Sequence, residues 1–305
     1  MNPNYQEFSY FADNARDAGL TDYAAPLVAR REVVVDGSRK VSGLVWGEGS
    51  PELVLVHGGA QNAHTWDTVA LALGCSLYAV DLPGHGQSDW RDDHAYWPSN
   101  LADDIAIAIA EIAPAAKGVV GMSLGGMTSL ALAHSHPQLV PELMIIDVTP
   151  GTDAVKAEPI IAFIDGPEYF ADFDEILART IEFNPTRSES SLRRGVLHNA
   201  HEQPDGRWTW NYDRERGDRK FGEGIADFAT MWDHLGGLGQ KVTLLRGALS
   251  KVVGDEDIIE FERRRPNDPV IVVDDAGHSI QGDQPLMLAQ IIRETFPDLS
   301  GASSD

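Results

Sequence analysis

Short apolar segments that do not alternate with polar residues recur through most of the chain. Four of them span residues 52–56, 76–80, 118–122 and 143–146, and two more follow a long gap, at 242–245 and 269–273. Strands show this pattern when helices cover both of their faces, as in a parallel sheet. The stretches between the segments are long enough for crossover helices. The sequence therefore predicts an α/β fold built on a mostly parallel sheet.

The residues before the first of these segments predict two further elements. Four apolar residues follow the i, i+3, i+4, i+7 spacing of one helix face: Phe8, Phe11, Ala12 and Ala15. Residues 1–30 are therefore predicted to form an N-terminal helical extension. Residues 31–36 and 40–46 flank the turn-forming pair Gly37 and Ser38, which predicts a β-hairpin at the start of the sheet.

The gap in the series, residues 151–235, has a different composition. It contains many aromatic residues, including Trp208 and Trp210, but no strong strand pattern. Helical patches such as 171–181 predict an inserted helical cap over the sheet. An irregular surface excursion is the alternative, but it would leave the aromatic side chains exposed to water. The predicted organisation is an extension over 1–30, a core over 31–150 and 236–298, and a cap over 151–235.

The 305-residue chain carries a net charge of −23 at pH 7. A field of that sign repels phosphate backbones and anionic membranes, so a small-molecule partner is expected rather than nucleic acid or a lipid surface. Cys75 is the only cysteine, which excludes an internal disulfide and favours a reducing compartment. The first residues have neither the basic region nor the apolar core of a secretory signal. A cytoplasmic location is therefore predicted.

One serine stands at the junction between an apolar segment and a helical stretch. The G-x-S-x-G motif of Gly121, Ser123 and Gly125 follows the segment at 118–122. A tight strand-to-helix turn holds such a serine in an exposed position, and the glycines two residues before and after it leave room for the turn. The start of the helix also favours a developing negative charge. Ser123 is therefore the predicted nucleophile.

A serine hydroxyl needs a general base, and His278 has the best context of the ten histidines. It follows the segment at 269–273 after a short turn, and its place near the C-terminus suits the chain order serine, acid, histidine. His198 and His201 are three residues apart and could ligate a metal, but no third ligand is evident. No metal and no cofactor is therefore predicted.

A glycine pair predicts where the oxyanion of the reaction would be stabilised. Gly58 and Gly59 follow His57 and the apolar segment at 52–56. Glycines here let the backbone turn so that an amide points at the carbonyl that the serine attacks. The expected donors are the backbone N–H groups of Gly59 and Leu124, whereas His57 is expected to be structural.

Four motifs together resemble the α/β-hydrolase family, in the order and approximate spacing that the family uses. They are His57-Gly58-Gly59 with Trp66 downstream, Asp81-Leu82-Pro83-Gly84-His85-Gly86, Gly121 to Gly126, and Ala276-Gly277-His278. The resemblance covers about 32–150 and 240–297. It implies an eight-stranded, mostly parallel sheet flanked by helices, with a cap inserted after the sixth strand, where residues 151–235 fall. In such proteins Asp81 looks structural, because it shapes a loop below the site.

The acid that would orient the histidine departs from the commonest family pattern. Members often carry it three residues after a glycine at the end of the seventh strand, where this sequence has Ser250. Asp255 and Asp257 lie further along that loop, but they resemble the acidic first turn of a helix. Asp147 ends the sixth strand, a location that some members use for their acid. We therefore predict Asp147, with Asp255 or Asp257, a weakened serine–histidine dyad, and a purely structural Asp147 as the alternatives.

These residues predict a hydrolase that cleaves carboxylic ester-like bonds through an acyl-enzyme on serine. The aromatic cap favours a small or medium-sized, largely apolar substrate, with Met122, Trp208 and Trp210 as candidate substrate-binding residues. Lactone or thioester hydrolysis, carbon–carbon bond hydrolysis and cofactor-free perhydrolysis fit the same residues. A non-catalytic ligand-binding homologue is the alternative outside catalysis, because a fold does not determine a function.

Overall fold

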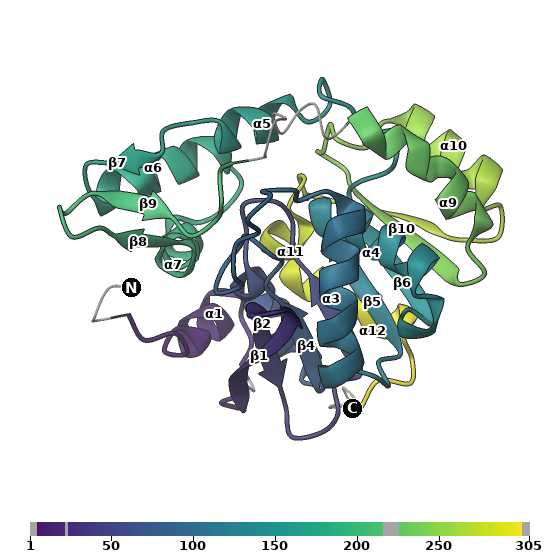
Figure 1. Cartoon of the computed structure of the whole chain (residues 1–305), viewed down its shortest axis with the longest axis horizontal. Coiled ribbons are helices and arrows are strands. Elements are labelled where there is room, and N and C mark those ends of the chain that lie inside the picture. The colour runs from purple at the N-terminus through teal and green to yellow at the C-terminus, as the bar shows by residue number, and fades with distance from the viewer. Residues whose placement is uncertain (1–4, 22–23, 216–225, 301–305) are drawn as a thin grey trace.

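The computed structural model describes residues 5–21, 24–215 and 226–300, and its central element is an eight-stranded sheet (Figure 1). The strand order is β1-β2-β4-β3-β5-β6-β10-β11. The strands are β1 (Val28–Asp36), β2 (Arg39–Trp46), β3 (Leu53–Val56), β4 (Leu77–Val80), β5 (Gly118–Met122), β6 (Glu142–Ile146), β10 (Lys241–Gly247) and β11 (Val270–Val273). β2 pairs antiparallel with β1 and with β4, and all other neighbours are parallel. The predicted sheet, its six apolar strands and its hairpin are confirmed.

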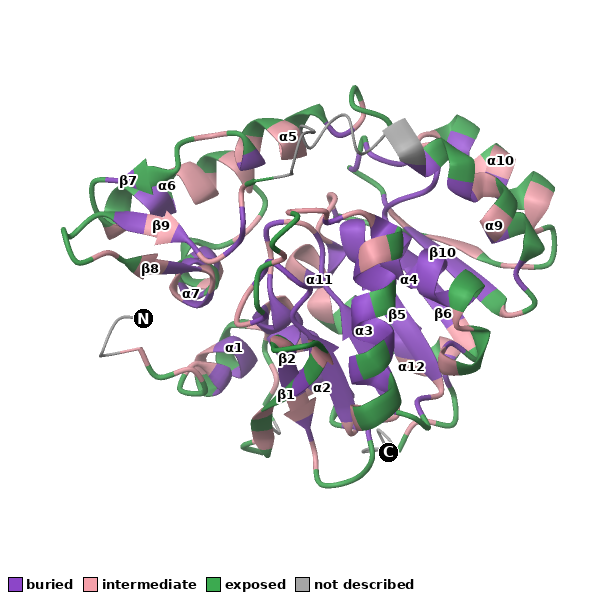
Figure 2. Ribbon diagram, viewed as in Figure 1, coloured by how far each residue is buried: buried purple, intermediate pink, exposed green. Residues whose placement is uncertain are grey.

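Helices cover both faces of the sheet, and each face has its own hydrophobic core (Figure 2). One face carries α3 (Pro98–Ile112), α4 (Leu124–Ser135), α9 (Trp232–Gly237) and α10 (Asp255–Arg264). The other carries α1 (Phe11–Asp17), α2 (Asp67–Leu73), α11 (Ile280–Asp283) and α12 (Pro285–Thr295). Short 3₁₀ turns are η1 (Ala63–Trp66), η2 (Pro137–Leu139) and η3 (Ala226–Met231). Every residue of β3, β4 and β5 is buried, which explains why these strands show no alternation.

The N-terminal extension is less helical than the sequence suggests. Helix α1 spans only Phe11–Asp17, and β1 has already begun at Val28. Phe11 is buried as predicted, but Ala12 is exposed and Asn14 is buried in its place. Asn14 faces inward because its Oδ1 accepts a hydrogen bond of 2.6 Å from Nε of Arg194 in the cap. The inner face of this helix is therefore partly polar, which the spacing of apolar residues did not predict.

The insertion after β6 forms a small body of its own at one side of the core (Figure 1). Its elements are α5 (Glu158–Ile164), β7 (Tyr169–Phe170), α6 (Phe173–Phe183), α7 (Glu189–Asn199), β8 (Ala200–Glu202) and β9 (Trp208–Trp210). The prediction of a helical cap is incomplete, because β7, β9 and β8 form an antiparallel sheet. These strands have only two or three residues each, too few to show alternation in a sequence.

The last part of the segment predicted as cap packs with the core instead. Phe228, Met231 and Leu235 belong to the hydrophobic cluster beneath α4, while the cap has a separate cluster that includes Ile176 and Trp208. None of the helices in the described ranges combines the length and apolar character needed to cross a bilayer.

Candidate active site

Ser123 lies in the turn that joins β5 to α4, in a backbone conformation that few residues adopt. Its φ and ψ are 53° and −121°, so the turn is strained in the way that exposes a nucleophile. A Cβ on Gly121 would lie 2.4 Å from the carbonyl oxygen of Gly125. A Cβ on Gly125 would lie 2.3 Å from the carbonyl oxygen of His57. The two glycines of the motif are therefore required by close backbone packing.

His278 lies in the loop between β11 and α11, with its ring between Ser123 and Asp147. Its Nε2 is 3.0 Å from Oγ of Ser123, and its Nδ1 is 2.7 Å from Oδ2 of Asp147. These partners indicate the tautomer in which Nδ1 carries the proton and Nε2 accepts from the hydroxyl. The structure thus brings together three side chains that lie 155 and 131 positions apart in the sequence.

Asp147 follows β6, is completely buried, and has a positive φ of 51°. Its Oδ1 accepts a hydrogen bond of 2.9 Å from the amide of Gly247. Its Oδ2 accepts one of 2.5 Å from the hydroxyl of Ser250, in addition to the one from His278. Ser250, at the position where the family often has its acid, thus contacts the carboxylate instead. No local pattern in the sequence indicates this role of Ser250.

The two alternative acids are engaged elsewhere. Asp255 is exposed at the start of α10, and its carboxylate lies 2.6 Å from Nη1 of Arg246. Asp257 is buried, and its Oδ2 accepts hydrogen bonds of 2.7 Å from Lys156 and from the amide of Gly254. Both residues belong to the acidic first turn of α10, as predicted. Neither forms a hydrogen bond with His278 among the described residues.

The expected oxyanion donors come from two separate segments of the core. Leu124 is the first residue of α4, so its amide has no acceptor within the helix. Gly59 follows β3 and lines the same cavity as Ser123. His57 supports this loop, because its Nδ1 donates to the carbonyl of Gly58 and its Nε2 accepts from the amide of Leu82. Burial lowers the pKa of His57, which keeps the ring neutral and suited to this structural role.

A cavity of about 720 Å³ opens at Ser123 and His278, with walls from both core and cap. Met122 and Trp210, two of the predicted substrate-binding residues, line it. Trp208 is not among its described lining residues, and this expectation needs correction. The ring of Trp208 packs in the cap core at 5.0 Å from Phe173 and borders a second cavity of about 730 Å³.

Asp81, His198 and His201 contact residues other than Ser123, His278 and Asp147. The Asp81 carboxylate accepts hydrogen bonds from the amide of Ala63 at 2.7 Å and from Arg30 at 2.6 Å, in keeping with the expected structural role. His201 bonds Oδ1 of Asn211 through its Nδ1. His198 is buried beside other residues, so the two histidines do not form a site with each other.

The sequence of this chain is similar to those of known proteins. The family model described as alpha/beta hydrolase fold matches residues 51–285. The chain is 42% identical over 294 residues to Esterase Rv0045c of Mycobacterium tuberculosis, covering 94% of each protein. It is 29% identical to a pimeloyl-[acyl-carrier protein] methyl ester esterase of Aeromonas salmonicida, covering 81% of this chain and 96% of the relative.

A solved structure of the Mycobacterium tuberculosis esterase, from work on its transition metal inhibition, superimposes with a TM-score of 0.84 at 40% identity. It covers 96% of this chain and 99% of the solved one. The similarity therefore extends over the core, the cap and the residues around Ser123.

Proposed function

This chain belongs to the α/β-hydrolase family and is a carboxylesterase-like hydrolase, and we propose that it cleaves small or medium-sized, largely apolar carboxylic esters through an acyl-enzyme on Ser123. The observation that carries the proposal is the continuous line of contacts from Asp147 through His278 to Ser123, at 2.7 and 3.0 Å. The 42% identity to an esterase over 94% of the chain supports the type of reaction.

In the proposed reaction, His278 Nε2 takes the hydroxyl proton while Oγ of Ser123 attacks the ester carbonyl. Asp147 holds the Nδ1 proton and stabilises the imidazolium that forms. The amides of Gly59 and Leu124 would donate to the oxyanion. His278 then returns its proton to the leaving alcohol and activates a water molecule, which releases the acid and regenerates Ser123.

The proposal also includes a role for the cap and a cellular location. The cap residues Ile160, Phe163 and Trp210 line the cavity together with Met122, so their apolar side chains would select the acyl or alcohol part of the ester. The cavity has room for a medium-sized ligand. A cytoplasmic location remains part of the proposal, and the buried, unpaired Cys75 supports it.

A panel of p-nitrophenyl esters with acyl chains of increasing length tests the reaction. A serine-directed organophosphonate, followed by peptide mass spectrometry, tests the nucleophile. We expect ester turnover and a single covalent adduct on Ser123. Labelling of another serine would contradict the assignment, and so would a protein that is folded but inactive on the whole panel.

Two neighbouring tryptophans offer a matched test of the cap. Trp210→Ala opens the wall of the cavity and should change the ratio of kcat/KM between long and short esters by about fivefold, as expected for altered pocket contacts worth ~1 kcal/mol. Trp208→Ala removes a ring from the cap core and should lower Tm while leaving that ratio unchanged. Equal shifts in chain-length preference for both variants would contradict the proposed role of Trp210.

A further inference from the structure

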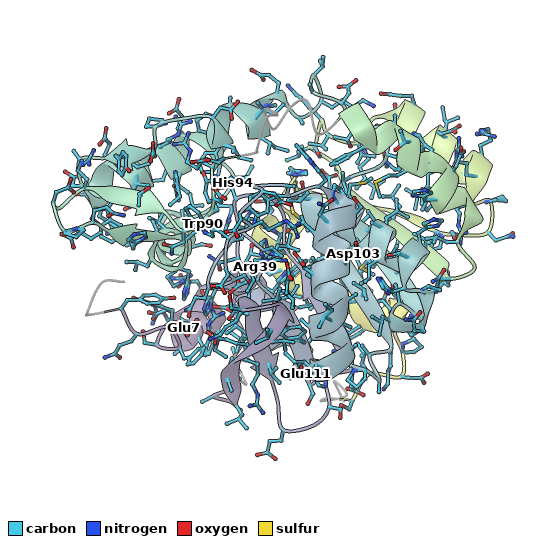
Figure 3. The ribbon with its side chains drawn as sticks, viewed as in Figure 1. Glu7, Arg39, Trp90, His94, Asp103 and Glu111 are labelled. Atoms are coloured by element: carbon cyan, nitrogen blue, oxygen red, sulfur yellow. The ribbon has the colours of Figure 1, made fainter. Side chains whose placement is uncertain are left out.

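One arginine of the cap lines the active-site cavity and has no role in the reaction proposed above. Arg187 lies between α6 and α7, and it contributes to the wall of the cavity that contains Ser123 and His278. The cavity has walls from both cap and core, and Figure 3 labels Trp90 and His94 on the side of the core that faces the cap. A charged side chain in the wall of this cavity can contact the substrate directly.

The guanidinium group of Arg187 uses few of its donors. An arginine has five N–H groups. Among the described residues, the one hydrogen bond of this group runs from Nη2 to Oγ of Ser191, at 2.8 Å. Its Nε is shielded from solvent and has no partner in the same part of the chain. Because arginine stays charged at the pH of any assay, a cation is held here in a half-buried position with few acceptors.

A nearby carboxylate attracts Arg187 without bonding to it. Asp283, the last residue of α11, acts on Arg187 electrostatically. Its Oδ1 accepts a hydrogen bond of 3.0 Å from Oγ1 of Thr186, and its Oδ2 accepts one of 2.8 Å from the amide of Gly277. Within the described ranges, no carboxylate oxygen lies at ion-pair distance from the guanidinium of Arg187. Its charge is therefore offset only from a distance.

Arg194 lines the same cavity and differs from Arg187 in this respect. Its Nε donates to Oδ1 of Asn14 at 2.6 Å, and its Nη1 donates to Oγ of Ser190 at 2.7 Å. The same Nη1 lies 2.8 Å from Oδ2 of Asp17. The part of the chain that the structure describes thus supplies a carboxylate contact to Arg194 and none to Arg187.

The guanidinium of Arg187 packs against the helix that follows the loop of His278. A Cβ on Gly282 would lie 2.9 Å from Cζ of Arg187 and 3.0 Å from its Nε and Nη1. Three nearly equal distances mean that the face of the group, rather than an edge, lies against Gly282. Gly282 belongs to α11 and is four residues after His278. Because the N–H groups lie in the plane of the guanidinium, this contact fixes the group but does not occupy its donors.

We propose that Arg187 binds a carboxylate of the substrate, so that the preferred ester carries one acidic group on an otherwise apolar chain. This inference rests on the proposed ester hydrolysis at Ser123. A guanidinium binds a carboxylate through two parallel N–H···O bonds, and Nη1 and the second N–H of Nη2 are the donors that remain for it. Met122 and Trp210 also line the cavity and would contact the apolar part of the chain.

The net charge of the molecule makes this contact decisive for selection. A net charge of −23 repels anions at long range. A preference for an anionic ester over a neutral one therefore has to come from a contact inside the cavity. Since Arg194 already bonds Asp17, Arg187 is the arginine of the cavity wall that can supply such a contact.

The test compares esters that differ in a single charge. Monomethyl esters of linear dicarboxylic acids of increasing length are the anionic substrates, and methyl esters of the linear monocarboxylic acids of the same length are their neutral partners. In the parent, the anionic ester of the best length should have a KM about tenfold below that of its neutral partner. In Arg187→Gln, the ratio of kcat/KM between the two should fall by about 10- to 100-fold, as expected for lost hydrogen bonds between charged groups.

Two further variants separate the contact from a change of surface charge. Arg193→Gln is the matched control and should keep the ratio of the parent, because Arg193 is exposed on α7 and is not among the described residues that line the cavity. Arg187→Lys keeps the charge but loses the planar pair of donors, so its ratio should lie between those of the parent and Arg187→Gln.

The outcomes distinguish this inference from the proposed reaction. If the parent cleaves the neutral esters but has a lower KM for none of the anionic ones, Arg187 does not select a carboxylate. A folded Arg187→Gln variant that keeps the ratio of the parent overturns the inference as well. A folded parent that is inactive on every ester of both series contradicts the esterase proposal, and this inference with it.

Discussion

This molecule contains two histidine–aspartate pairs. They share the contact between the histidine Nδ1 and a buried carboxylate, but the other partners of the two residues differ. His278 places Nδ1 2.7 Å from the buried carboxylate of Asp147, and His64 places Nδ1 3.0 Å from the buried carboxylate of Asp67. Asp147 has two further donors, the Gly247 amide and the Ser250 hydroxyl. Asp67 has only His64 as a hydrogen-bond partner of its carboxylate in the described ranges.

The second nitrogen of each ring decides what the pair can do. Nε2 of His278 faces the hydroxyl of Ser123, which can give up a proton. Nε2 of His64 faces the carboxylate of Glu7, which can only accept one. His64 is thereby stabilised as an imidazolium and is a poor base, whereas His278 is suited to take a proton in the reaction. A histidine–aspartate pair is therefore not catalytic by itself, because the group on the far side of the ring sets its chemistry.

Ser123→Ala should produce the largest effect and separate the two pairs most clearly. We expect kcat to fall by about 10⁴-fold or more, as in other serine hydrolases without their nucleophile. Tm should be nearly unchanged, since the hydroxyl makes few packing contacts. Measurement of kcat on the best ester of the panel checks this. Activity within tenfold of the parent would mean that catalysis does not depend on this serine.

Asp147→Asn and Asp67→Asn compare the two aspartates directly. The amide at position 147 favours the wrong tautomer of His278, so kcat should fall by about 10³- to 10⁴-fold near neutral pH. The same change at Asp67 should alter kcat by less than about tenfold, because His64 does not contact Ser123. Asp255→Asn, at an exposed helix start, is the control for a change of surface charge. Similar losses in the Asp67 and Asp147 variants would remove the distinction between the pairs.

The sheet was predictable because its determinants are local. Buried strands need continuous apolar residues, and the Gly37 turn with its φ of 57° specifies a hairpin. The cap sheet was not predictable, because strands of two or three residues leave no periodic signal. The buried face of α1 also escaped prediction, because Asn14 is buried only through its bond to Arg194, 180 positions away.

The catalytic candidates were partly predictable for the same reason. Gly121 and Gly125 identify Ser123 through local geometry, and the end of β6 favours Asp147 over the helix start at Asp255. The contact between Ser250 and Asp147 joins residues 103 positions apart and has no local signal.

Glu7→Gln should have an intermediate effect, on stability rather than on catalysis. The pKa of His64 lies at about 9 in the folded chain, above its ordinary value of 6.5. The charged ring therefore stabilises the fold by on the order of 3 kcal/mol below pH 6.5, and this contribution is lost as the pH rises to about 9. Removing the Glu7 carboxylate should lower the pKa of His64. The loss of stability between pH 6.5 and about 9 should therefore be smaller in the variant.

Urea unfolding of parent and variant at pH 6.5, 7.5 and 9 measures the difference in the free energy of unfolding. The free energy of unfolding below pH 4.5 gives a second check on Glu7. Burial opposes the charge on Glu7, but its hydrogen bonds to His64 and Arg30 lower the pKa of Glu7 to about 2. Its contribution is therefore present above pH 4.5 and disappears as the pH falls toward 2. An unchanged loss of stability between pH 6.5 and 9 in the variant would contradict the account of His64.

Ser250→Ala should have the smallest effect. It tests whether the hydrogen bond from Ser250 to Asp147, which has no counterpart at Asp67, contributes to kcat. The Ser250 hydroxyl and His278 Nδ1 both bond to Oδ2 of Asp147. Without the hydroxyl, the carboxylate keeps the Gly247 amide on Oδ1 but is held less firmly in the plane of the imidazole. Loss of one hydrogen bond to a charged group, worth about 1.5 kcal/mol, corresponds to a roughly tenfold lower kcat. KM should be unchanged, because Ser250 does not line the cavity among the described residues.

Ser250→Thr keeps a hydroxyl at the same place and should restore most of the activity, which separates positioning from packing. A lower kcat in Ser250→Ala with no recovery in Ser250→Thr would show that the residue only fills space beside Asp147. The difference between the two aspartates would then rest on Ser123 and Glu7 alone.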